Sequence, residues 1–312
     1  MAAILEGGCR VTTIREGEPM VAGTVKMWRQ VGRDSGARAI SLRTLEFDAG
    51  ESPKLLNPEC DQVAYVLEGE GSITIDGSVY GIEPEMGVYI RPGQAFSVQN
   101  PNREPIVLIS SQCPEPESGA EVIVAAKGAT DEFACASSVK QDDQATCGSA
   151  AGATGEAAFR GDEPGSRAGS AHEGLGTPHS DSVFTRPATQ SSVGKTAPLV
   201  RLADRKALPT GDRWYRVLVD DEVGSTQVTQ FIGSIPPGRA PDHFHLYEEV
   251  LFILSGEGRM WAGKASTPVG AGSCVYLPRK QSHCVENTGT GELRLLGVFY
   301  PAGSPAVRYD AD

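Results

Sequence analysis

The amino-acid sequence predicts an all-β protein with two barrel domains. Short runs of Val, Ile, Leu and Tyr, such as SITI, GVYI, VLFIL and CVYLP, alternate with Gly, Pro, Asn and Asp, which is the pattern of strands joined by turns. No long stretch carries the spacing of an amphipathic helix. A chain of 312 residues is long enough for two cores of ordinary size. We therefore expect two antiparallel barrels of the jelly-roll kind.

An internal repeat supports two domains of the same fold. The segment YVLEGEG, which begins at Tyr65, aligns with FILSGEG, which begins at Phe252, at a shift of 187 residues. The same shift aligns Asn100 with Asn287 without a gap. The chain therefore contains a duplicated domain.

A segment of different composition separates the two copies. Between Gln141 and Thr196 large apolar residues are rare amid Gly, Ala, Ser, Thr and mixed charge. Such a stretch cannot bury enough surface to offset the entropy lost on ordering. We expect residues 23–116 to form the first domain, 117–196 a long flexible linker and 197–308 the second domain.

Three of the five histidines lie in the second copy at a spacing that suits one metal site. His243 and His245 are two residues apart, so both imidazoles lie on one face of a strand. Glu249 follows at another position on that face, and His283 arrives from a strand more than thirty residues later. A closed barrel can bring these four side chains together.

These residues resemble the two sequence motifs of the cupin superfamily, over roughly residues 205 to 308. The residues that fit the first motif, a glycine, HxH, a glutamate and a glycine, are Gly238, His243, His245, Glu249 and Gly256, with four rather than five residues after the first glycine. Those that fit the second motif are Gly272, Pro278, His283 and Asn287, with Lys280 where glycine is usual. The resemblance implies two cupin barrels, with a 3-His/1-Glu centre in the second.

The repeat predicts what the first copy carries at the four ligand positions. At the shift of 187 residues these positions hold Leu56, Pro58, Gln62 and Phe96, in chain order. Leu, Pro and Phe cannot coordinate, and a lone amide oxygen is a poor anchor for a transition metal. We therefore expect one divalent metal per chain. The first barrel then packs against the second as an intramolecular pseudo-dimer, and a homodimer is a further possibility.

The ligand set resembles that of cupin dioxygenases such as quercetinases. The resemblance implies a metal-dependent oxygenase that acts on a small, oxygen-chelating anion, with Fe(II) or Mn(II) favoured over Ni, Cu or Zn, and Glu249 as the catalytic base. Bicupin oxalate decarboxylases share the ligands but usually keep them in both domains. Two alternatives stay open: a metal-dependent isomerase or lyase of a sugar or hydroxy acid, and a non-catalytic cupin that binds a small ligand.

Three further residues are candidates to bind the substrate. Tyr247, Arg259 and Trp261 lie near the mouth or wall of the barrel by their positions in the motif. The strand phase through Arg259 and Trp261 is not fixed by the sequence. Aromatic residues in strands more often pack than contact a ligand.

Charge and composition bear on partners and location. The formal net charge of -12, without a Lys/Arg cluster, argues against nucleic acid and anionic membrane surfaces as partners. The seven cysteines form no CxxC pair and predict reduced thiols. The start MAAILEGGCR lacks a signal-peptide pattern, and no segment approaches transmembrane length. We expect a cytoplasmic protein with a small-molecule substrate.

Overall fold

The computed structural model describes residues 2–116, 122–124, 197–307 and 309–310. The flexible linker expected at 117–196 therefore lies, apart from three residues, outside the described part. The described residues form antiparallel strands and four 3-10 helices of a single turn, so the expected all-β class is confirmed. No helix within them is long and apolar enough to cross a membrane.

The first copy of the repeat supplies twelve described strands and one 3-10 helix. They are β3 (Met20–Ala22), β4 (Val25–Val31), η2 (Arg33–Ser35), β5 (Leu42–Phe47), β6 (Gly50–Glu51), β7 (Lys54–Leu56), β8 (Asp61–Glu68), β9 (Gly71–Ile75), β10 (Ser78–Ile82), β11 (Met86–Ile90), β12 (Ala95–Asn100), β13 (Ile106–Cys113) and β14 (Val122–Val124).

The second copy repeats this order. Its described elements are β16 (Leu208–Thr210), β17 (Arg213–Val219), η4 (Asp221–Val223), β18 (Thr229–Ile235), β19 (Gly238–Arg239), β20 (His243–Phe244), β21 (Glu248–Ser255), β22 (Glu257–Ala262), β23 (Ala265–Gly270), β24 (Ser273–Leu277), β25 (His283–Asn287), β26 (Leu293–Tyr300) and β27 (Tyr309–Asp310). Short elements precede each copy: β1 (Ala3–Ile4), η1 (Glu6–Gly8), β2 (Arg10–Thr13), β15 (Leu199–Arg201) and η3 (Leu202–Asp204).

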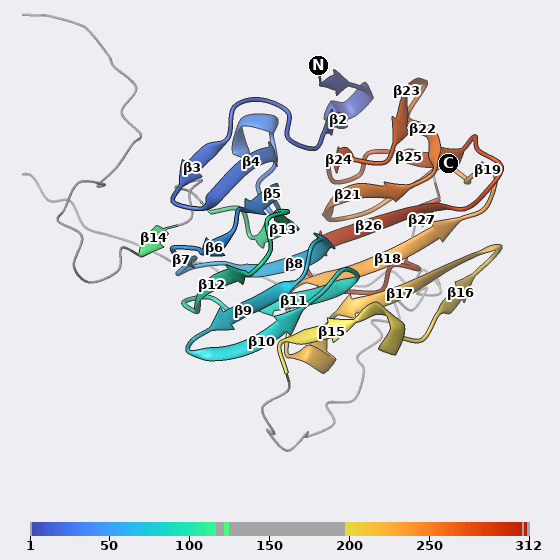
Figure 1. Ribbon diagram of the computed structural model, residues 1–312. Helices are drawn as coiled ribbons and strands as arrows, with labels where there is room; N and C mark the ends of the chain where they lie inside the picture. Colours follow the sequence, from blue (N-terminus) through green and yellow to red (C-terminus); the bar gives the residue numbers. More distant parts are fainter. Residues whose placement is uncertain (1, 117–121, 125–196, 308, 311–312) are drawn as a thin grey trace, which may run out of the picture. The chain divides into compact units, whose positions relative to one another are not determined.

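Each copy is built from two antiparallel sheets (Figure 1). In the first copy their strand orders are β15-β11-β8-β13-β5-β4-β3 and β10-β9-β12-β7-β14, with β6 also paired to β12. In the second copy they are β1-β2-β24-β21-β26-β18-β17-β16 and β23-β22-β25-β20-β27, with β19 also paired to β25. The chain thus forms the two barrels that the repeat predicts.

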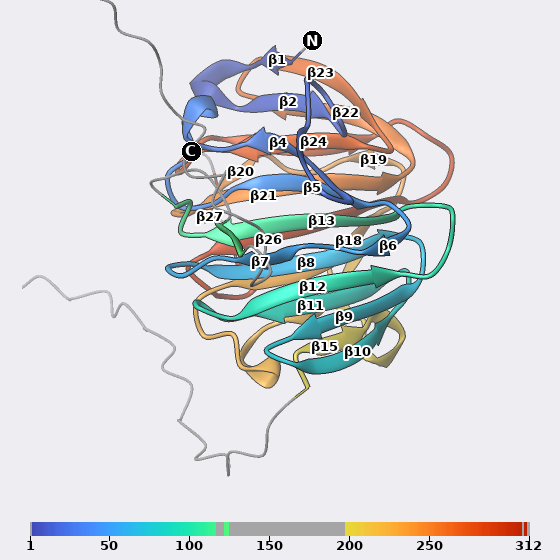
Figure 2. The same cartoon turned by 60° about the vertical axis from the view of Figure 1, so that its left-hand side comes forward.

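The two copies exchange strands at their starts. β2 begins the chain but pairs with β24 of the second copy, where Val11 lies opposite Val275. β15 precedes the second copy but pairs with β11 of the first, where Leu199 lies opposite Val88. Figure 2 shows the dark blue β2 beside the orange strands of the second copy. The limits 23–116 and 197–308 therefore describe the repeat but not the sheets.

Three hydrophobic clusters form the core. Phe96 belongs to the cluster inside the first barrel and Phe299 to the cluster inside the second. The third cluster draws on both copies, with Tyr65 and Phe252 among its members, and so lies between the barrels. Burial of one large apolar side chain contributes about 1.5–3 kcal/mol, so this shared cluster holds the two barrels together.

A buried polar contact also joins the barrels. The carboxylate of Glu248 in β21 accepts hydrogen bonds from the backbone N–H groups of Arg38 and Ala39, at 2.9 and 2.8 Å. Neighbouring residues of a strand face opposite ways, so Glu249 points into the second barrel while Glu248 faces the first. The strand that carries the predicted glutamate ligand is thereby anchored to the first copy.

Candidate metal centre

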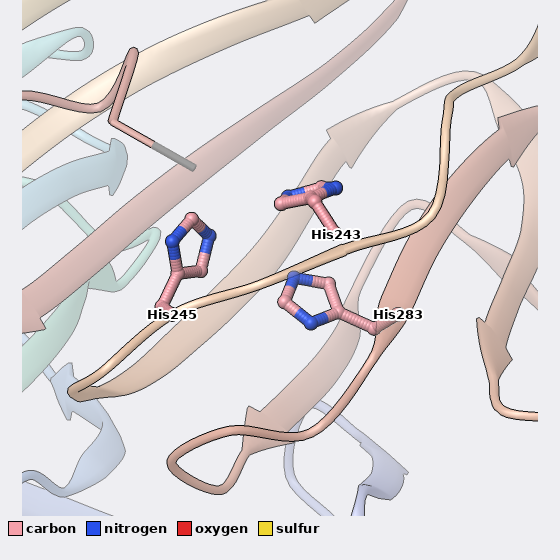
Figure 3. Close-up of side chains that lie close together, drawn as sticks. All are labelled: His243, His245 and His283. Atoms are coloured by element: carbon pink, nitrogen blue, oxygen red, sulfur yellow. The ribbon is translucent and has the colours of Figure 1, made fainter. Parts of the chain in front are cut away.

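Three histidine side chains converge inside the second barrel. His243 lies in β20, His245 follows two residues later, and His283 begins β25, where it pairs directly with His243. Figure 3 shows the three imidazole rings close together, from the two segments that the motifs predict. One ring nitrogen from each histidine lies within 4.8 Å of the others. The structure therefore brings together the three predicted histidines.

Hydrogen bonds orient two of these rings. His243 Nδ1 lies 3.1 Å from the Pro241 carbonyl oxygen, and His283 Nδ1 lies 2.8 Å from that of Gln281. A carbonyl oxygen only accepts, so Nδ1 carries the proton in both rings. Nε2 then keeps its lone pair for a metal, which is the usual arrangement of histidine ligands.

Tyr247 supports the third ring. It stacks on His245 with ring centroids 4.8 Å apart and an angle of 7° between the planes. It also stacks on Phe299, at 4.6 Å and 19°. Tyr247 is not among the residues that line the cavity beside the histidines. The structure therefore favours a supporting position for Tyr247 over the direct substrate contact suggested by the motif.

Glu249 lies buried beside the histidine cluster. Its side chain comes from β21, and Oε2 is 3.4 Å from Nε2 of His245. Burial raises the pKa of Glu249 to about 8. A buried carboxyl group without an adjacent cation takes up a proton in this way, and a bound divalent ion would reverse the effect by its charge.

Burial also keeps two of the imidazoles neutral. It lowers the pKa of His245 to about 4 and that of His283 to about 3, with His243 as the second cause of each shift. Neutral imidazole is the form that binds a divalent metal. Three imidazoles and one carboxylate are ligands that divalent transition metals from Mn to Zn accept. The donor set therefore fits a divalent transition metal ion.

A cavity of about 130 Å³ adjoins the histidine cluster. A cavity near 150 Å³ holds a molecule the size of benzene, so this one suits about six non-hydrogen atoms. The residues that line it are Thr210, Arg213, Trp214, Tyr215, Phe231, Gly233, Ser234, Ile235, His243, His245, Glu249, Leu251, His283, Val285, Leu295 and Pro305. Apolar walls thus enclose a small space with polar groups at few points.

Arg259 and Trp261 lie outside this cavity. Between and beside them Met260 and Ala262 point into the core of the second barrel, so the other two side chains face outward from β22. Trp261 Nε1 donates to Glu286 Oε2 at 2.8 Å. Arg259 donates to Ser266 Oγ at 2.9 Å. We therefore withdraw these two residues as substrate contacts, because the strand phase that the sequence leaves open turns them away.

Arg213 and Tyr215 line the cavity but lie outside the sequence motifs. Both come from β17, which forms a hairpin with β16, and Thr210 of β16 lies opposite Arg213. Among the described residues that line the cavity, Arg213 is the one basic side chain. Nothing local in the sequence marks it, because its position depends on strand pairing far from the motifs.

Strand register corrects the alignment of the two copies at the ligand positions. His243 lies opposite His283 in the second copy, whereas Leu55 lies opposite Phe96 in the first. The first ligand position is therefore Leu55 rather than Leu56. The shift is 188 residues here and returns to 187 after the loop before β8, since Gln62 pairs with Ile90 as Glu249 pairs with Leu277.

The correction also changes the second ligand position, from Pro58 to Asn57. Asn57 is buried, and its Oδ1 accepts hydrogen bonds from the backbone N–H groups of Glu59 and Cys60. The first copy still carries no histidine at these positions, because all five histidines of the chain follow residue 171.

Both copies match the cupin domain family, over residues 43–111 and 231–299. The oxalate-binding protein of Thermotoga maritima is 36% identical over 67 residues, which are 21% of this chain and 55% of that protein. Auxin-binding protein 1 of Arabidopsis thaliana is 28% identical over 86 residues, which are 24% of this chain and 43% of that protein. The chain spans about half the length of these curated relatives.

Solved structures share the two-barrel fold. Oxalate decarboxylase from Bacillus subtilis, in a structure concerned with its Mn(II) centres, gives a TM-score of 0.63 at 13% identity and covers 94% of this chain and 78% of its own. A glyoxylate-induced protein from Pseudomonas aeruginosa gives 0.61 at 16% identity and covers 96% of this chain and 91% of its own. At these identities the likeness shows the fold alone. Two cupin domains in one chain, with a histidine cluster in the second that fits a metal site, identify the protein as a bicupin of the cupin superfamily.

Proposed function

We propose that the second barrel holds one divalent transition metal ion and acts as a lyase on a small carboxylate. The ligands would be His243, His245, His283 and Glu249. The observation that carries the proposal is a cavity of about 130 Å³ lined by these four side chains, because it suits a chelating acid of about six non-hydrogen atoms. Oxalate has this size, and both an oxalate-binding protein and oxalate decarboxylases are similar to this chain.

The size of the cavity also decides between classes of substrate. Flavonols, the substrates of quercetinases, have three linked rings and exceed a space suited to one small ring. Sugars bring several hydroxyl groups, whereas the walls here are mostly apolar side chains such as Phe231, Leu251 and Leu295. A small carboxylate that binds a metal through its oxygens matches the cavity better than either. This proposal replaces the quercetinase-like oxygenase with a lyase.

The residues of the chain have separable parts in this proposal. A bound divalent ion would supply Lewis-acid polarisation of the substrate oxygens. The apolar walls exclude water, which strengthens electrostatic interactions inside the site. Glu249 is the candidate acid–base group, because burial brings its pKa to about 8 and so close to neutral pH. Decarboxylation of oxalate takes up one proton and yields CO2 and formate, so its balance needs no oxidant.

Mn(II) is the first metal to test. Manganese centres occur in the similar oxalate decarboxylase structure, and nitrogen and oxygen donors accept Mn(II) as well as Fe(II), Ni(II), Cu(II) and Zn(II). Elemental analysis of the purified protein identifies the metal that the chain retains.

The test is a screen of metal-loaded protein with oxalate and other acids of two or three carbons, in air and without oxygen. We expect CO2 release that does not require oxygen and that is lost with His245→Ala. Oxygen uptake with release of cleaved product would favour an oxygenase. Tight binding of an acid without turnover would favour a ligand-binding cupin, and absence of metal would reject the proposal.

A further inference from the structure

We propose that Arg213 binds a second anionic group of the substrate, so that the site selects small dianions over monoanions. This inference rests on the proposed function, because it assigns the end of the substrate that does not contact the metal. Arg213 starts β17 and lines the same cavity as the three histidines.

The charges around the cavity define the ligand that fits. Of the described residues that line it, Glu249 is the one acidic side chain and Arg213 the one basic side chain. A divalent ion with one carboxylate ligand and neutral imidazoles carries a net charge of one positive unit, and Arg213 adds a second. A small dianion neutralises both, whereas a monoanion leaves one charge without compensation in a partly apolar space.

The guanidinium of Arg213 is well placed for this task. Its side chain is 20% exposed, and Nε lies 3.6 Å from Oδ1 of Asp212, which is itself 78% exposed. An exposed ion pair of this kind contributes about 0–1 kcal/mol, so Asp212 competes weakly with a buried substrate carboxylate. Arginine also presents a planar fork of N–H groups that matches a carboxylate.

The first barrel provides an internal comparison. The residue at the equivalent place is Val25, because Lys26 lies opposite Glu46 as Trp214 lies opposite Ser234 in the second copy. Val25 is 2% exposed and belongs to the core of the first barrel. The copy without histidines thus carries an apolar residue where the copy with histidines carries a cation.

The experiment compares a dianion with a monoanion of similar size, oxalate with glycolate, on Mn(II)-loaded protein by calorimetric titration. We expect Arg213→Gln to weaken oxalate binding about 10- to 100-fold, the value of a lost charge-assisted hydrogen bond. Glycolate binding should change less than about twofold, since its contacts lie at the metal. Arg213→Lys, which keeps the charge but not the fork, should fall between the two.

The matched control is Arg294→Gln. Arg294 belongs to the same barrel, makes an exposed ion pair with Glu85 at 2.8 Å, and does not line the cavity. It removes the same charge and should leave the ratio of the two affinities unchanged. Metal content and melting temperature, measured for each variant, identify any loss of fold.

The outcomes separate this inference from the proposed function. If Arg213→Gln weakens oxalate and glycolate equally, or changes neither, Arg213 does not select dianions although the metal site and its substrate class stand. If the wild-type protein binds metal but neither anion, the inference and the proposed function both fail.

Discussion

The two barrels share one fold but differ in what occupies the same end of it. In the second barrel three histidines and Glu249 border a cavity. The first barrel holds a buried ion pair there, in which Arg43 Nη2 lies 3.5 Å from Glu115 Oε2 and both side chains are 0% exposed. The same strands therefore support a ligand site in one copy and a closed polar core in the other. Function in this fold depends on a few side chains, not on the barrel itself.

Strand register shows that these contents replace one another. Arg43 lies opposite Ser110 in the first barrel, and Phe231 lies opposite Gly297 at the equivalent place in the second. Gln62, which stands where the second copy has its glutamate, donates from Nε2 to Ser110 Oγ at 3.0 Å. The first barrel is therefore filled at this end by polar groups that bind one another. The leucine, proline and phenylalanine filling expected from the ungapped repeat is wrong in this respect.

The largest expected effect is on metal content. His245→Ala should reduce the bound metal from one equivalent per chain to nearly none, because two imidazoles alone hold a divalent ion weakly. Gln62→Ala, the change on the other side of the comparison, should leave one equivalent. Elemental analysis after gel filtration measures both. Two equivalents of tightly bound metal in the wild-type protein would show that the barrels are alike in function.

The next effect is on stability and belongs to the first barrel. Glu115→Ala leaves the Arg43 guanidinium buried without its carboxylate, and breaking a buried ion pair in this way costs about 3–5 kcal/mol. Replacing both residues by leucine should cost less than the single change, because no buried charge remains. Urea unfolding gives these free energies, with the exposed Glu104→Ala as control. A loss below about 1 kcal/mol would mean that water reaches the pair.

The motifs make the metal ligands predictable, because the spacing within His243 to Glu249 depends only on strand alternation. Arg213, Arg43 and Glu115 escape prediction for a physical reason. Their neighbours are set by pairing between strands that are far apart in the sequence, and no local pattern encodes that register. The same holds for the exchange of β2 and β15 between the two copies.

The ungapped repeat gives the wrong residues for a related reason. The loop between β7 and β8 is one residue longer in the first copy, and loops tolerate such insertions. Sequence similarity is strong only after this loop, so the shift of 187 hides the change. Hydrogen-bonded pairs such as Leu55 with Phe96 reveal it.

A third prediction concerns pH and the protein without metal. Two histidines of the second barrel have a folded-state pKa of about 4 and about 3, below the model value of 6.5. Between about pH 6.5 and 4 the unfolded chain binds protons that the folded chain refuses, so stability falls as pH falls. Glu249 acts in the opposite direction, because its folded pKa of about 8 lies above 4.5. Its contribution falls as pH rises from about 4.5 to 8.

These contributions place an optimum near pH 6.5. Below it two histidines outweigh one glutamate, and above it only the glutamate changes. Melting temperature in the presence of a chelator should therefore decline on both sides, by about 3 kcal/mol in stability at pH 4.5. Glu249→Gln should remove the decline between pH 6.5 and 8. A flat profile over that range in the wild-type protein would mean that Glu249 is ionised in the metal-free fold.

The smallest expected effect tests the replacement of Arg43 by Phe231. A Cβ atom on Gly297 would lie 2.3 Å from the Phe231 ring, which is closer than packed carbon atoms approach. Gly297→Ala should therefore displace the ring and cost about 1–3 kcal/mol, as overpacking does. Ser110→Ala at the equivalent place removes only the hydrogen bond to Gln62 and should cost about 1 kcal/mol. Because the ring lines the cavity, Gly297→Ala should also weaken oxalate binding, whereas Ser110→Ala should not. Unfolding in urea and calorimetric titration measure the two effects, and equal oxalate affinity in both variants would show that the glycine opposite Phe231 does not shape the cavity.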